Sequence, residues 1–166
     1  MSDKQNHFKE ILAPLYFEAG AGLYDSQTLE YGISLLLFLL SDRGLIEFAV
    51  DDARAIVEGE KKKTIGQVLH IVKQHVTISS EWDATIQEGL QGRNRLVHGY
   101  LINNIENFLE EDKREQLIKE VRAMRRAIQA ADKAVRDIIG VLVQLYGVSL
   151  ESIQEQVVQD FGLRSN

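Results

Sequence analysis

The sequence contains no cysteine and a single proline, Pro14, among its 166 residues. The lack of cysteine excludes a disulfide scaffold, a thiol nucleophile and any zinc site that needs thiolate ligands. The scarcity of proline, together with many helix-forming residues, predicts an all-helical chain. Pro14 itself suits the first turn of a helix, where its missing N–H does no harm.

Long hydrophobic runs and an excess of positive charge are lacking as well. The longest apolar stretch, residues 33–40 with one serine, is too short to span a bilayer, and residues 1–10 lack the apolar core of a signal peptide. We therefore expect a cytoplasmic protein that does not enter a membrane. The formal net charge is −6, so any contact with nucleic acid must use a local basic patch.

The N-terminal third of the sequence has the residue pattern of a helix. Residues 14–40 have a helical composition, with weak points at Gly20 and Gly22 and a possible new N-cap at residues 25–26. Residues 33–40 are apolar nearly all round such a helix, which indicates burial on more than one side. In a small bundle, the second buried side suggests a dimer interface.

The rest of the chain predicts further helices. Residues 45–63 read as a connection with a short helix near 51–59, and Thr64–Gln67 has the form of a capping box that starts a helix to about His75. Another helix is expected from residue 80 to about residue 100. A heptad seam then predicts a long helix over residues 111–146, packed lengthwise on antiparallel partners. The seam consists of Leu117, Val121, Met124, Ile128, Ala131, Val135, Ile138, Leu142 and Leu145.

Together these elements predict the fold class all-α. The expected architecture is an antiparallel up-and-down four-helix bundle with short extra helices at the termini and in the first long connection. We expect residues 1–25 to form an N-terminal helical extension and residues 26–147 to form the bundle. Residues 148–166 should form a short C-terminal helix, capped by Ser149, and a tail.

The helix expected over residues 80–100 carries an unusual polar group. On a helical wheel its apolar side holds Trp82, Ile86, Leu90, Leu96, Val97 and Tyr100. Arg93 falls near the middle of that side, and burying an unpaired guanidinium costs several kcal/mol. Arg93 must therefore be paired, open to a cleft, or at an interface. Asn94 and His98 lie together on the flank, whereas Arg93 and His98 are roughly 140° apart on an ideal helix. They converge only because arginine is long or because Gly99 loosens the helix end.

A plain structural interpretation stands beside the functional one. Arg93 can make a structural salt bridge, and His98 can be a satisfied histidine at a helix C-terminus. Glu30 is a candidate partner that holds Arg93 in place. Alternatively, Glu30 belongs with Ser34 and Ser41 to a thin stripe that faces solvent.

The last long helix carries a basic set: Arg122, Arg125, Arg126, Lys133 and Arg136. These side chains flank an RNA groove, or they form a solvated face balanced by Glu120, Asp132 and Asp137. The histidines outside the motif show no metal-ligand spacing, so we assign no metal and no cofactor.

Arg93, four intervening residues and His98, with the polar Asn94 directly after the arginine, resemble the R-x4-H motif of HEPN (higher eukaryotes and prokaryotes nucleotide-binding) domains. His98 and Tyr100 continue it into H-x-Y, as in HEPN toxins that are paired with nucleotidyltransferase antitoxins. The resemblance covers about residues 26–146. It implies a metal-independent endoribonuclease, a toxin or defence component, with a composite site at a homodimer interface. RNA and a nucleotidyltransferase-type antitoxin are the implied partners.

The resemblance also implies roles for individual residues. His98 would act as acid or base, Arg93 would bind the scissile phosphate, and Asn94 would orient the phosphate or His98. Tyr100 would be the site of silencing nucleotidylation; otherwise it is a tyrosine at the core edge with its hydroxyl in water. The alternative function is a non-catalytic HEPN-like helical module that binds a protein or nucleotide partner.

Overall fold

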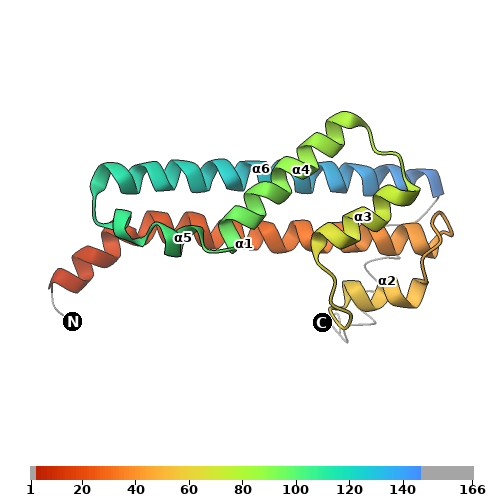
Figure 1. The fold of residues 1–166 in the computed structure, drawn as a ribbon, viewed down its shortest axis with the longest axis horizontal. Coiled ribbons are helices and arrows are strands. Elements are labelled where there is room, and N and C mark those ends of the chain that lie inside the picture. The colour runs from red at the N-terminus through yellow and green to blue at the C-terminus, as the bar shows by residue number, and fades with distance from the viewer. Residues whose placement is uncertain (1–2, 147–166) are drawn as a thin grey trace, which may run out of the picture. The chain divides into compact units, whose positions relative to one another are not determined.

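The computed structural model describes the backbone of residues 3–146 and the side chains from residue 9 onward. Within this range the chain is all-helical, as predicted, and contains no strand. The helices are α1 (Asp3–Asp42), α2 (Val50–Val57), α3 (Ile65–His75), α4 (Ser80–Val97), α5 (Tyr100–Asn103), the 3₁₀ helix η1 (Ile105–Phe108) and α6 (Glu111–Tyr146), shown in Figure 1.

The chain divides into two compact units, Met1–Val135 and Arg136–Asn166. The described part of the second unit, residues 136–146, is the last segment of α6. The first unit contains the other helices and the rest of α6. The C-terminal helix predicted after Ser149 lies outside the described residues.

Helix α1 is one continuous helix of 40 residues, so two predictions for this region are wrong. Pro14 lies inside the helix and not in its first turn. Its ring is exposed while Leu12 and Leu15 are buried, so the carbonyl that Pro14 leaves without a donor can face water as the apolar side stays packed. No new helix starts at residues 25–26, because the Ser26 hydroxyl donates back to the Gly22 carbonyl at 2.7 Å.

The apolar stretch at residues 33–40 is buried on more than one side, as its pattern indicated. Ile33, Leu36, Leu37, Leu39 and Leu40 are all buried within the single chain. Helices α2, α3 and α4 all pack on α1. This burial therefore has an explanation within one chain, and the stretch no longer argues for a dimer interface.

The predicted starts of α3 and α4 are confirmed. The Thr64 hydroxyl accepts from the Gln67 N–H at 3.3 Å, and the Thr64 N–H donates to Gln67 Oε1 at 2.9 Å, which completes the capping box. The Ser79 hydroxyl caps α4 by accepting from the Trp82 N–H at 3.3 Å. Helix α4 ends at Val97, earlier than predicted, because Gly99 adopts a left-handed φ of 98°. At this frayed end Val97 is exposed and not part of the buried side.

The directions of the long helices differ in part from the prediction. Successive residues of α1 contact successive residues of α6, with numbers that increase along both helices: Glu18 with Arg122, Asp25 with Arg125, and Gly32 against Val135. The two helices therefore run parallel, while α4 runs antiparallel to α6, with Gly89 against Ala131 and Gly92 against Met124. Figure 1 shows the reason, since α2 reverses the chain once more between α1 and α3 than a four-helix order requires.

Helices α4 and α6 approach closely at two glycines. A Cβ added to Gly89 would lie 2.2 Å from the Ala131 Cβ and 2.9 Å from the Ala127 carbonyl oxygen. On α6 the predicted seam is buried from Leu117 to Val135. This contact holds the C-terminal half of α4, which carries Arg93, at a fixed distance from α6.

Candidate functional site

Arg93 projects from α4 toward α1 and is paired there. Its side chain is 17% exposed. The Arg93 Nε donates to Glu30 Oε1 at 2.7 Å, and Nη2 makes a second, short bond to the same oxygen. The partly buried guanidinium thus has the ionic partner that its place on the apolar side required.

Asn94 and His98 complete the group around Arg93. Arg93 Nη1 donates to Asn94 Oδ1 at 3.0 Å and lies 3.2 Å from His98 Nε2. Because a guanidinium can only donate, the contact with His98 is a hydrogen bond when Nε2 carries no proton. The contact is possible because His98 has left the helix, with φ −95° and ψ 52°, so the ideal 140° separation no longer applies. The structure thus brings together the sequence-predicted Glu30, Arg93, Asn94 and His98.

Glu30 is the partner of Arg93, and the stripe of Glu30, Ser34 and Ser41 expected to face solvent is wrong, because Ser41 is buried. The carboxylate pairs with Arg93, yet the Glu30 side chain is 39% exposed. The Ser34 hydroxyl donates to the Glu30 backbone carbonyl at 3.0 Å and does not contact the carboxylate. The Glu30 carboxylate is therefore a partner of Arg93 that solvent, and hence a ligand, can reach.

Tyr100 belongs to a different cluster. Its hydroxyl donates to Glu120 Oε2 at 2.8 Å, and Arg95 Nη2 donates to the same oxygen at 2.7 Å. The Arg95 guanidinium also lies over the Tyr100 ring, 4.9 Å from its centre. Burial and the hydrogen bond to Glu120 raise the pKa of Tyr100 above its usual value. The expectation of a hydroxyl in water is therefore wrong. Arg95 and Glu120 were missed because no helical wheel connects two helices.

Two members of the basic set on α6, Arg122 and Arg125, pair with carboxylates of α1 and not with those expected. Arg122 Nε donates to Glu18 Oε1 at 2.7 Å. Arg125 bonds Glu18 at 3.1 Å and Asp25 at 2.8 Å. The hydrogen bond from Arg122 is the main cause that lowers the pKa of Glu18. These pairs join α6 to α1, so Arg122 and Arg125 serve the fold.

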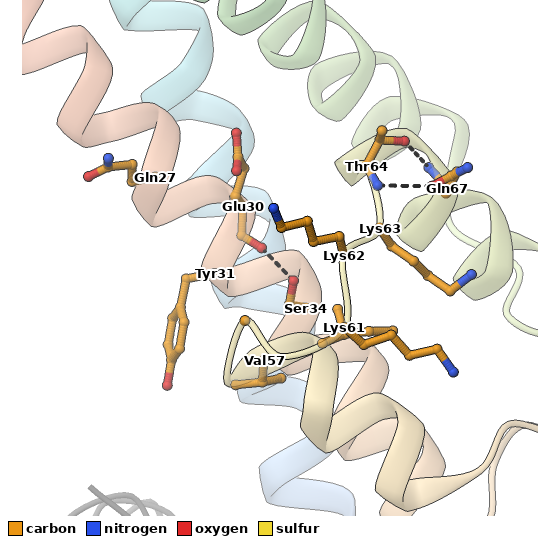
Figure 2. Close-up of a pocket in the computed structure, with 12 residues that line it drawn as sticks. Gln27, Glu30, Tyr31, Ser34, Val57, Lys61, Lys62, Lys63, Thr64 and Gln67 are labelled. Carbon is orange, nitrogen blue, oxygen red and sulfur yellow. Dashed lines mark hydrogen bonds between the residues drawn. The ribbon is translucent and has the colours of Figure 1, made fainter.

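A pocket of about 560 Å³ has Glu30, the partner of Arg93, in its lining. It is lined by Gln27, Glu30, Tyr31, Ser34, Ile56, Val57, Gly59, Lys61, Lys62, Lys63, Thr64 and Gln67. Figure 2 shows the Lys62 side chain extending toward Glu30, while Lys61 and Lys63 are directed away. The sequence indicated only that three lysines end a connection, because their nearness to Glu30 depends on how α2 and α3 pack against α1.

Among the side chains described, no group of three or more His, Asp or Glu residues is placed to hold a metal ion. None of the helices in residues 3–146 has the length and apolar character needed to cross a membrane. Comparisons with protein-family models, curated proteins and solved structures found no match to this chain.

Proposed function

We propose that this chain is a HEPN-type, metal-independent endoribonuclease, a toxin or defence component whose composite site forms at a homodimer interface in the cytoplasm. The observation that carries the proposal is the contact of Arg93 Nη1 with both His98 Nε2 and Asn94 Oδ1. It joins a phosphate-binding cation, a proton-transfer group and an orienting amide at one exposed helix end. In fold terms, the proposal takes α1, α3, α4 and α6 as the four principal helices, with α2 as an additional one.

The chemistry needs a base, an acid and a cation at one phosphate. The ribose 2′-oxygen attacks phosphorus and gives its proton to the base, while the P–O5′ bond breaks and O5′ takes a proton from the acid. The products are a 2′,3′-cyclic phosphate and a 5′-hydroxyl. Imidazole can act as base or acid near neutral pH, and the Arg93 guanidinium can stabilise the charge that develops on the phosphate oxygens.

The homodimer supplies the second proton-transfer group. One chain offers a single His98 at the motif, whereas the reaction uses a base and an acid on opposite sides of the phosphate. Two copies of the motif facing each other provide both. His98 and Asn94 are exposed, so they are accessible to a second copy. Sedimentation velocity that shows only a monomer, with or without RNA, would contradict this arrangement.

The principal test is an RNase assay in EDTA with structured and single-stranded RNA. Wild-type protein should produce termini with a cyclic phosphate. Arg93→Ala and His98→Ala should lower the rate by at least about 100-fold, the range expected for loss of a general acid–base or charge-stabilising group. His75→Ala, on the exposed end of α3, is the matched control and should cleave like wild type. Cleavage that persists in the His98 variant would refute the proposal.

A second function, a non-catalytic module that binds a protein or nucleotide, is favoured by one observation. The Arg93 guanidinium already bonds Glu30 and Asn94 and contacts His98, as a purely structural arginine would. Capture of a defined partner with no cleavage of any RNA would support it. In the toxin version, an antitoxin of the nucleotidyltransferase type would first have to free the Tyr100 hydroxyl from Glu120 before modifying it.

A further inference from the structure

The lysine pocket next to Glu30 has walls that are fixed by helix ends. Helix α2 closes with Gly59 at a left-handed φ of 78°, and the Lys61 N–H donates to the Ala55 carbonyl at 2.9 Å. Helix α3 starts at the capping box of Thr64 and Gln67. Residues 61–63 are held between these two points as a short connection beside α1.

The charges in this pocket favour an anion. Lys61 pairs with Asp52 at 2.7 Å, whereas Lys62 and Lys63 have no ion-pair partner in the described part of the chain. The single carboxylate of the lining is Glu30, whose charge is shared with Arg93. In a protein of net charge −6, this pocket is a local basic patch of the kind that contact with nucleic acid requires.

An aromatic side chain stands at the same pocket. Tyr31 directly follows Glu30 on α1, lines the pocket and is 42% exposed. Proteins that bind single-stranded nucleic acid combine cations for the backbone with aromatic rings on which bases stack. Lys62 and Tyr31 offer these two elements on either side of Glu30 (Figure 2).

We propose that this pocket holds a nucleotide of a single-stranded RNA, next to the phosphate bound by Arg93. Lys62 binds the phosphate of that nucleotide, and Tyr31 stacks on its base. Glu30 forms the wall shared by the two subsites, because its carboxylate bonds Arg93 and its side chain lines the pocket. The assignment rests on the proposed RNA substrate and adds where the strand runs relative to the motif.

The test measures RNA binding apart from cleavage. Fluorescein-labelled single-stranded RNA of mixed sequence is titrated with full-length His98→Ala protein, followed by anisotropy at several salt concentrations. Adding Lys62→Gln should weaken binding and reduce the slope of log Kd against log salt by about 0.7, the value for one phosphate contact on a single strand. Adding Tyr31→Ala should weaken binding roughly five-fold or more, the loss of one stacked base. Tyr31→Phe should bind normally, since phenylalanine keeps the ring.

Lys119→Gln is the matched control, an exposed lysine on α6 outside the pocket lining, and it should leave the salt slope unchanged. If Lys62→Gln and Tyr31→Ala bind like this control while wild-type protein cleaves RNA through His98, the pocket assignment is wrong and the proposed function stands. If binding depends on Lys62 and Tyr31 but no RNA is cleaved, the pocket assignment stands and the nuclease proposal fails. Absence of RNA binding overturns both. Competition by AMP as strong as that by unlabelled RNA would assign the pocket to free nucleotides and overturn the strand assignment.

Discussion

Substituting Gly89 by alanine should loosen the contact between α4 and α6. The new Cβ would lie 2.2 Å from the Ala131 Cβ and 2.9 Å from the Ala127 carbonyl oxygen. Carbon atoms in good contact lie about 3.5–4.0 Å apart, so the helices must separate by roughly 1 Å or more. Overpacking of this kind costs about 1–3 kcal/mol, while alanine gains about 1 kcal/mol in helix propensity over glycine. Because the clash includes backbone, we expect a net loss of stability of about 1–2 kcal/mol.

The assay is urea unfolding followed by circular dichroism, with Gly66→Ala as the matched control. Gly66 lies in α3, is exposed and has nothing within 4 Å of an added Cβ. The same chemical change there should therefore stabilise the protein by about 0.5–1 kcal/mol. The two variants should differ in sign, and Ala131→Gly added to the Gly89 variant should recover part of the loss by removing the nearer clash. A Gly89 variant as stable as the Gly66 variant would refute the close packing of α4 on α6.

Three further predictions concern charged groups. Because the bond from Arg122 lowers the pKa of Glu18, the stability that this carboxylate contributes is complete above its unfolded pKa of about 4.3 and is lost as pH falls through the lower folded value. Glu18→Gln should flatten this acid dependence in urea titrations across pH, and an unchanged slope would contradict it. Tyr100→Phe should cost about 1–3 kcal/mol by removing a hydrogen bond to a charged acceptor, and difference absorbance should show the wild-type phenol ionising above its usual pKa; equal stability would argue against the bond. Glu30→Gln should tighten RNA binding in the anisotropy assay, because it removes a charge that competes for Arg93 but keeps an acceptor; weaker binding would mean that the carboxylate itself aids the complex.

Local features of the fold were predictable because their causes are local. The capping box of Thr64 and Gln67 and the seam of α6 each depend on residues a few positions apart. The continuity of α1 through Pro14 was not predictable in this way. Leu12 and Leu15, on either side of the proline, are buried in the folded chain, and amino-acid composition does not reveal that burial.

The candidate site likewise combines features that the sequence predicts with features that depend on the packing of separate helices. The wheel placed Arg93 where a partner was needed, and the partner is Glu30, 63 residues earlier in the chain. Which of the two interpretations of Glu30 held depended on the packing of α4 against α1. The bond of Tyr100 to Glu120 and the pocket of Lys62 likewise form only when separate helices meet.

The contact between Arg93 and His98 depends on where α4 ends. Arg93 lies just before the last turn of α4, and His98 is the first residue beyond the helix, so their contact depends on the helix stopping at Val97. The left-handed backbone of Gly99 enforces that stop, since other residues rarely adopt its φ of 98°. One additional helical residue would turn the His98 imidazole away from the Arg93 guanidinium. The distance between the Arg93 guanidinium and the His98 imidazole thus depends on the backbone torsion of Gly99, a residue with no functional group.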